Sequence, residues 1–236
     1  VDDRPRQFAL LFDKGKFPFA ITNKINNDRI AKIAQDKYLS YLFAPDFHAQ
    51  SFLLVNQSQL DIFCKTQQDD NIVIKELLGH GGKQVYVGPA KDYNQTLNFP
   101  LLGQRFIDTS GGFPELASGH HDIRVVLFDG QPIHGLVREA APNKLKSNFA
   151  EGGSVRGLFT SEIPRSLIEM AQELDRRFAI DVPRLFSADW GFDKDLQSWK
   201  LFEINSAPGL ALASVDGPAA DEFTNLLAKH LARSTH

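Results

Sequence analysis

The chain has 236 residues, of which 42% are hydrophobic and 23% charged, and its formal net charge of −3 gives no reason to expect a nucleic acid partner. No apolar run approaches the roughly 20 residues of a membrane span, so no membrane is expected as a partner. The single cysteine, Cys64, excludes an internal disulfide and a cysteine-rich zinc site, and it makes the cytoplasm the default compartment.

The predicted elements of the first hundred residues are short. Strand-like runs at residues 8–12 and 17–22 flank a Lys-Gly-Lys turn. Asp28 is a candidate cap for a helix that continues to Leu42, because apolar residues recur there at helical spacing. Three more strand-like runs cover residues 51–55, 71–75 and 84–88.

Longer elements are predicted in the second half of the chain. Residues 123–128 and 133–138 flank Asp129-Gly130, a pair that favours a hairpin turn. A helix is expected over Ser161–Phe178, with Ser161 as its cap. A further strand pair and a last helix are expected at residues 184–192, 199–205 and 223–231. Strands joined mostly by hairpins, with a few helices, predict an α+β fold.

A soft domain boundary is expected near Gly103. The smaller unit, residues 28–103, would hold a glycine-rich loop, and the larger unit, residues 104–236, would hold most of the acidic chemistry.

The glycine-rich loop is a candidate phosphate site. It follows the strand-like run 72–75 and consists of Gly79, His80, Gly81, Gly82 and Lys83. Glycines let backbone amides turn towards an anion, and Lys75 and Lys83 would add positive charge. The loop is not a P-loop, because Gln84 stands where Ser or Thr is needed. It is not a dinucleotide fingerprint, because a strand follows it. The alternative is a structural hairpin turn with His80 as a solvated residue.

The strand pair 184–192 and 199–205 carries a candidate metal site. A turn centred near Leu196 would place Asp189 opposite Glu203, and strand alternation puts Glu203 and Asn205 on one face. Phe202 and Ile204 would then face the core. Carboxylate and amide oxygens suit Mg²⁺. The alternative is an exposed polar face on which the two carboxylates repel each other.

Two arginines lie at the open end of the predicted hairpin. Arg124 follows Asp122-Ile123, and Arg138 closes the next strand. Their planar donors can converge on a phosphate or a carboxylate. A salt bridge with Asp122 or Glu139 is the alternative.

The motifs become specific in their order, which is Gln35-Asp36-Lys37, Val73-Ile74-Lys75, the glycine loop, Gln104-Arg105-Phe106-Ile107, Asp122-Ile123-Arg124, Arg138, Ser147-Asn148 with Gly152-Gly153, Asp189, and Glu203-Ile204-Asn205-Ser206-Ala207-Pro208-Gly209. This series resembles the ATP-grasp superfamily, and it is most similar to RimK-like and prokaryotic glutathione synthetase-like carboxylate–amine ligases. The resemblance spans about residues 23 to 212. It implies two α+β subdomains with a nucleotide site between them.

The resemblance also implies a role for each matching position. Lys37 and Lys75 would contact nucleotide phosphates, and the loop Gly79–Lys83 would close over them. Gln104, Phe106 and Ile107 would form the hinge beside adenine, and Asp108, or alternatively Glu115, would hold the ribose. Asp189, Glu203 and Asn205 would bind Mg²⁺, with Mn²⁺ as a substitute. Arg124, Arg138 and Asn148 would face the transferred phosphoryl group.

The implied activity is an ATP- and Mg²⁺-dependent ligase that joins a carboxylate to an amine through an acyl phosphate, on an amino acid or a peptide. The alternatives are a phosphotransferase of the same fold and a non-catalytic nucleotide-binding module that acts with a partner chain. Relatives carry an additional N-terminal domain, so residues 1–27 are expected to be its remnant or a linker. The chain could then form a homo-oligomer or pair with a separate N-terminal subunit.

Overall fold

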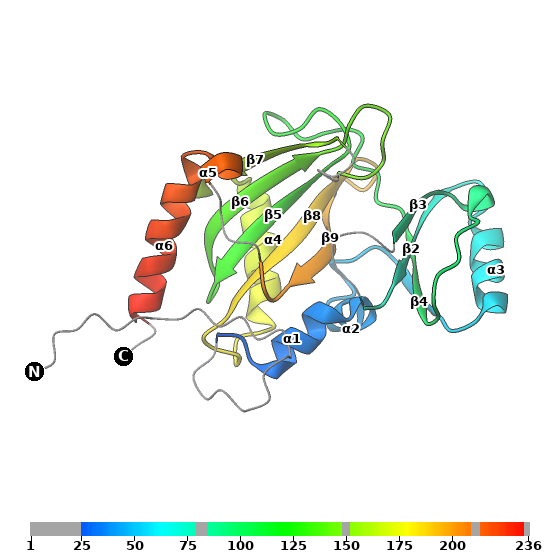
Figure 1. Cartoon of the computed structure of the whole chain (residues 1–236), viewed down its shortest axis with the longest axis horizontal. Helices are drawn as coiled ribbons and strands as arrows, with labels where there is room; N and C mark the ends of the chain where they lie inside the picture. Colours follow the sequence, from blue (N-terminus) through cyan, green and yellow to red (C-terminus); the bar gives the residue numbers. More distant parts are fainter. Residues whose placement is uncertain (1–24, 79–84, 148–151, 209–212, 234–236) are drawn as a thin grey trace, which may run out of the picture.

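The computed structural model describes residues 25–78, 85–147, 152–208 and 213–233. This part of the chain forms two antiparallel sheets that lie side by side (Figure 1), a five-stranded sheet in the order β7-β6-β5-β8-β9 and a four-stranded sheet in the order β1-β4-β2-β3. Helices pack on both, so the α+β expectation is confirmed. The strand-like runs expected at 8–12 and 17–22 lie outside the described residues.

The larger sheet is built from two hairpins and one added strand, namely β5 (His121–Phe128), β6 (Gln131–Glu139), β7 (Ser154–Leu158), β8 (Leu185–Asp193) and β9 (Ser198–Asn205). The turn between β5 and β6 consists of Asp129 and Gly130, with φ angles of 45° and 81°, as a two-residue hairpin turn requires. Both predicted hairpins are confirmed. Strand β7 was not predicted. Its sequence is short and polar and therefore gives little strand signal, and the strand forms because it pairs with β6.

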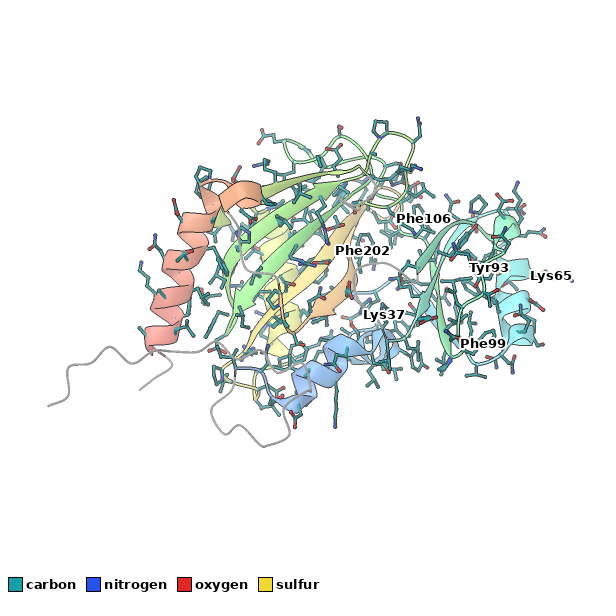
Figure 2. The ribbon with its side chains drawn as sticks, in the orientation of Figure 1. Lys37, Lys65, Tyr93, Phe99, Phe106 and Phe202 are labelled. Atoms are coloured by element: carbon teal, nitrogen blue, oxygen red, sulfur yellow. The ribbon has the colours of Figure 1, made fainter. Side chains whose placement is uncertain are left out.

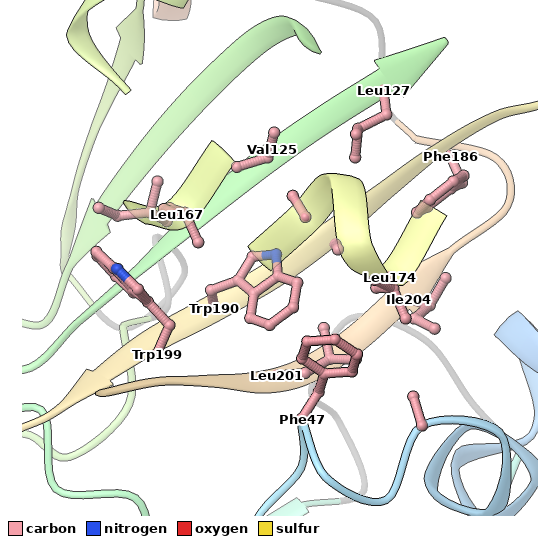
Figure 3. Packing of buried hydrophobic residues seen from close by; sticks show 14 of the residues in the cluster. Phe47, Val125, Leu127, Leu167, Leu174, Phe186, Trp190, Trp199, Leu201 and Ile204 are labelled. Atoms are coloured by element: carbon pink, nitrogen blue, oxygen red, sulfur yellow. The ribbon is translucent and has the colours of Figure 1, made fainter. Parts of the chain in front are cut away.

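Helices cover the two faces of the larger sheet. Helix α4 (Arg165–Arg176) packs Leu167 and Leu174 on one face, against Trp190 (Figure 3). Helix α6 (Ala219–Arg233) follows the short α5 (Ala213–Asp216) and packs Phe223 and Leu227 on the other face. Because α6 covers only one end of that face, the other end is available for polar residues.

The start predicted for α4 was wrong. Ser161 lies in a separate 3-10 turn, η3 (Thr160–Glu162), and Pro164 occupies the N-cap position of α4. Proline has a fixed φ and no backbone N–H donor, so it is tolerated at the start of a helix but not in its interior. The regular helix therefore begins after Pro164.

The helix expected from Asp28 is divided in two. Asn27, and not Asp28, caps α1 (Asp28–Gln35) by accepting a hydrogen bond from the Ile30 amide. Asp36 then leaves the helical conformation, and its side chain accepts hydrogen bonds from the amides of Tyr38 and Leu39. This cap starts α2 (Lys37–Phe43). This second cap places Lys37 in the first turn of α2.

The smaller sheet contains β1 (Ser51–Leu54), β2 (Asn71–Glu76), β3 (Val85–Pro89) and β4 (Leu101–Arg105), with α3 (Gln57–Thr66) and the 3-10 turn η1 (Ala90–Asp92) against it. Neither α3 nor β4 was predicted. The side chains of Leu54 and Phe63 pack directly against the backbone at Gly103 in β4. A Cβ at this position would lie 2.9 Å from Leu54 and 3.1 Å from Phe63. A glycine in this position weakens the strand pattern in the sequence.

The boundary expected near Gly103 lies inside β4, which ends at Arg105. Helix α1 and the residues that follow α2 contribute Ile30, Ala34 and Phe47 to the core of the larger sheet. In the part of the chain that the structure describes, no helix combines the length and the apolarity needed to cross a membrane.

Candidate functional site

A cleft lies where the two sheets meet. It is lined by Ala34, Lys37, Ser40, His48, Leu102, Gln104, Phe202, Glu203 and Ile204. These residues come from the helix pair α1–α2, from the segment between α2 and β1, from β4 and from β9. The cleft therefore exists only when both sheets are in place. Figure 2 shows Lys37 at the start of α2 and Phe202 on β9, at the side of the larger sheet that faces the smaller one.

Two lysines bring positive charge to the cleft. Lys75 on β2 donates a hydrogen bond of 2.9 Å to Gln104 Oε1, and Gln104 donates one of 2.9 Å to Ser51 Oγ. Burial lowers the pKa of Lys75 to about 8, although the Glu203 carboxylate acts in the opposite direction. Burial also lowers the pKa of Lys37, again against Glu203. The site therefore presents two partly desolvated ammonium groups, which favours binding of an anion.

Gln104 and the residues after it were predicted to form an adenine hinge. The Gln104 side chain is 2% exposed and orients Lys75. Phe106 lies beside the His120 ring, and Ile107 is buried. Asp108, the ribose candidate, binds Lys194 at 2.8 Å. Burial would raise its pKa, but Lys194 and Ser110 outweigh burial and lower it.

Glu115, the alternative ribose candidate, is exposed in a turn with a φ of 64°. The loop residues Gly79, His80, Gly81, Gly82 and Lys83, and the candidate Asn148, lie outside the described residues.

The candidate metal ligands lie on neighbouring strands. Asp189 on β8 is opposite Glu203 on β9, and Asn205 is opposite Ser187, so the predicted pairing is confirmed. A register shift beside Asp189 makes Phe202 an extra residue of β9. The prediction that Phe202 faces the core was therefore wrong.

Ile204 enters the core as predicted, Leu201 enters it in place of Phe202, and Phe202 lines the cleft. The Phe202 ring lies over Gly191, where a Cβ would come within 2.4 Å of it. Gly191 is thus required for this position of the ring.

Asp189 is bound by both arginines. Arg124 donates from Nε to Oδ1 at 2.7 Å and from Nη2 to Oδ2 at 2.8 Å. Arg138 donates from Nη2 to Oδ2 of Asp189 at 2.7 Å and from Nε to Asp122 at 2.6 Å. Burial alone would raise the pKa of Asp189, but the two arginines outweigh it and hold the pKa below its usual value. The salt bridge between Arg138 and Asp122, considered as an alternative, is present.

Register explains why these charges meet. Asp122 is directly opposite Arg138, and Arg124 is directly opposite Asp189. Together with Glu203, they form a charged row across β6, β5, β8 and β9, on the face and at the end that α6 leaves uncovered. Cross-strand neighbours have Cβ atoms about 5 Å apart, which is close enough for direct pairing of long side chains.

The donor set fits a hard divalent cation. Burial and the nearby Asp189 raise the pKa of Glu203, whereas Lys37 lowers it. The buried Nδ2 of Asn205 has no hydrogen-bond partner within the described residues. An ionised Glu203 and the Asn205 amide oxygen suit Mg²⁺, and Asp189 adds a carboxylate if its arginines release it. Among the described residues, no three His, Cys, Asp or Glu side chains form a metal cluster, so phosphate oxygens would have to complete the coordination.

His48 was not singled out from the sequence, yet it is buried and lines the cleft. Its Nε2 lies 3.2 Å from Ser40 Oγ, and its buried Nδ1 has no partner in the described part of the chain. Burial lowers the pKa of His48 to about 3, and Lys75 acts in the same direction. The imidazole is therefore neutral at pH 7. A lone histidine between a helix and a strand carries no sequence signal that would have revealed this position.

Comparison with known proteins gives a family match over more than half of the chain. The profile of the family described as prokaryotic glutathione synthetase, ATP-grasp domain, matches residues 36–180. A glutathione synthetase of Agrobacterium fabrum is 30% identical over 110 residues, which cover 45% of this chain and 32% of that protein. A probable alpha-L-glutamate ligase of Marinomonas sp. is 23% identical over 173 residues, which cover 69% of this chain and 50% of that protein. The chain spans half or less of the curated relatives that it matches.

Solved structures show the same fold. The ATP-grasp ligase PsnB, complexed with a phosphomimetic variant of its minimal precursor, Mg and ADP, has a TM-score of 0.59 at 15% identity, over 89% of this chain and 62% of PsnB. The D-alanine–D-alanine ligase of Bacillus anthracis has a TM-score of 0.58 at 13% identity, over 89% of this chain and 69% of that ligase. At these identities the likeness concerns the fold alone.

Proposed function

Because the chain belongs to the prokaryotic glutathione synthetase ATP-grasp family, we propose that it is an ATP- and Mg²⁺-dependent ligase that joins a carboxylate to an amine. The observation that carries the proposal is the cleft between the two sheets, which is lined by Lys37, Gln104 and Glu203. Lys75 is attached to it through a hydrogen bond of 2.9 Å to Gln104. Relatives named glutathione synthetase and alpha-L-glutamate ligase support ligation as the type of reaction.

The nucleotide would bind in this cleft. Lys37 and Lys75 supply two ammonium groups for phosphate oxygens, and Gln104 keeps Lys75 oriented through their hydrogen bond. Phe202 provides an aromatic surface beside them, on which a base can stack. The neutral His48 adds a hydrogen-bonding edge without adding charge.

When bound, Mg²⁺ supplies charge neutralisation at phosphate oxygens and orients the phosphoryl group. Glu203 and Asn205 would hold it from β9, and Asp189 would join them from β8. Each of these side chains is on a strand rather than on a loop, so their separation is set by sheet pairing.

The proposed reaction consists of two displacements. A substrate carboxylate oxygen attacks the γ-phosphorus of ATP, ADP leaves, and an acyl phosphate forms. The nitrogen of a neutral amine attacks the acyl carbon, phosphate leaves, and the amine loses a proton as the amide forms. Negative charge develops on oxygen in both steps, and Arg124 and Arg138 are the fixed donors closest to the candidate metal ligand Asp189.

We infer that the substrate is an amino acid or a peptide. The names of the curated relatives, glutathione synthetase and probable alpha-L-glutamate ligase, support this inference. It also agrees with the two guanidinium groups beside the site, because guanidinium binds carboxylates through paired hydrogen bonds.

The test is calorimetric titration of the chain with ATP, with and without Mg²⁺, followed by ADP release in the presence of pooled amino acids. Saturable, Mg²⁺-dependent binding and ADP release that requires both an acid and an amine are expected. ADP release with a stable phosphorylated product and no amine dependence would identify a phosphotransferase. Absence of ATP binding would contradict the proposal.

A further inference from the structure

The segment that follows β6 contacts both sheets. Its start is attached to the larger sheet, where the Ala140 amide donates to the His120 carbonyl at 2.8 Å. Six residues later, Lys146 Nζ donates to the Val85 carbonyl of β3 at 2.7 Å. Ser147, the next residue, donates from Oγ to Asp122 on β5. Two adjacent side chains therefore join an edge strand of the smaller sheet to a central strand of the larger one.

Both ends of this connection lead into the candidate site. Val85 is directly opposite Lys75 in the pairing of β2 with β3, so Lys146 contacts the strand position that faces a proposed phosphate ligand. On the other side, Asp122 also binds Arg138, and Arg138 binds Asp189. The contacts thus run without interruption from the β2–β3 ladder to the charged row.

The Ser147 contact matters for Asp122. This acid is 5% exposed, and burial raises its pKa despite the opposing effect of Arg138. A buried carboxylate needs donors for both oxygens to remain ionised, and here Arg138 binds one oxygen and Ser147 the other. Loss of Ser147 would leave Arg138 as the only donor that the described residues offer to Asp122.

We propose that Lys146 and Ser147 are positioning residues, which we call the 146–147 bridge, and that this bridge couples nucleotide binding at Lys75 to the placement of Arg138. Lys146 holds β3 at its distance from the larger sheet, and Ser147 holds Asp122 in the orientation that Arg138 requires. The coupling to the nucleotide rests on the proposed function, whereas the attachment of β3 to the larger sheet does not. Neither residue needs to touch a substrate.

The chain offers a matched control for the charge of Lys146. Lys144 is two residues away, is exposed, and carries the same charge. Lys144→Met therefore removes the same charge from the same segment while the contact with Val85 remains. Lys146→Arg keeps a donor of similar reach and is the rescue variant.

The first arm measures hydrogen exchange of residues 85–89 in the full chain without ligand. Lys146→Met is expected to raise the exchange rate there by about tenfold. A change of this size is typical when one charge-assisted hydrogen bond is lost, because the free energy of local opening falls. Ser147→Ala, which removes a contact on the other sheet, is expected to raise it too. Lys144→Met and Lys146→Arg should match the unchanged chain. Equal exchange in Lys146→Met and Lys144→Met would overturn the bridge, whether or not the chain binds ATP.

The second arm measures the Kd for Mg·ATP in Lys146→Met, Ser147→Ala and the double variant. Each single change is expected to weaken binding by about 5- to 20-fold, and the double variant by less than the product, because both residues act through one connection. Multiplicative effects would overturn the coupling alone. If the unchanged chain does not bind Mg·ATP, the proposed function and this coupling are overturned together, and the exchange arm still decides whether the bridge exists.

Discussion

Arg124 and Asp189 form a bidentate ion pair between neighbouring strands, with N–O distances of 2.7 and 2.8 Å. The carboxylate proposed as a metal ligand is thus paired with a guanidinium group. A cation at Asp189 would compete with Arg124 and Arg138 and would free their donors for the substrate.

The importance of Asp189 for folding is testable with Asp189→Asn. The change leaves two partly buried guanidinium groups without their shared counter-ion, so the free energy of unfolding should fall by about 3 kcal/mol. Urea denaturation measures this. Asp195→Asn, in the exposed turn between β8 and β9, is the control and should change little. A stability equal to that of the control would mean that the ion pairs do not contribute to folding.

Glu203→Gln separates the metal site from the fold. Burial and the nearby Asp189 disfavour the charged form of Glu203 and raise its pKa, so a neutral side chain of the same shape should preserve stability or increase it slightly. Binding of Mg·ATP should nevertheless weaken at least tenfold, because an anionic ligand is lost. Calorimetry and thermal unfolding on one sample test both statements. Unchanged Mg·ATP affinity would exclude Glu203 as a ligand.

Lys75 predicts a specific dependence of stability on pH. Its pKa falls from 10.5 to about 8 on folding, mainly through burial. Between those two values the unfolded chain binds more protons than the folded chain, so this group makes stability rise as pH increases from 8 towards 10.5. Below pH 8 its unfavourable contribution is constant.

Lys75→Met should therefore stabilise the ligand-free chain at pH 7 and reduce the rise in stability between pH 8 and 10, while it weakens binding of ATP. The exposed Lys65 on α3 provides the control Lys65→Met. Urea midpoints measured at several pH values distinguish the two variants. The same pH profile in both would show that Lys75 is not desolvated.

Phe202→Ala tests the aromatic surface of the cleft. Loss of base stacking is expected to weaken ATP binding by about tenfold, since stacking on an aromatic side chain contributes about 1–3 kcal/mol per base. Phe52→Ala, at an exposed aromatic residue of the smaller sheet, should not affect the Kd for ATP. If ATP and inorganic triphosphate lose affinity equally in Phe202→Ala, the ring does not contact the base.

Local sequence patterns were sufficient for the elements whose information lies within a few residues. Asp129-Gly130 predicted its hairpin because few residue pairs adopt two consecutive left-handed conformations without strain. The polar turn between β8 and β9 predicted their hairpin, and the order of motifs indicated the ATP-grasp fold. These statements depend on turn geometry and on side-chain alternation, which are properties of short segments. The exact pairing of Asp189 with Glu203 also depends on the register shift beside Asp189.

Other features arise only when distant segments meet. The bulge that turns Phe202 into the cleft depends on Gly191 across the strand pair, and the low pKa of His48 depends on burial by both subdomains. Whether Asp189 is paired with arginines was likewise decided by the register of β5 against β8. Periodicity identifies which face of a strand is apolar, but the partner that covers that face is chosen by long-range packing. For this reason the candidate residues could be named from the sequence, while their contacts, burial and charge states required the tertiary structure.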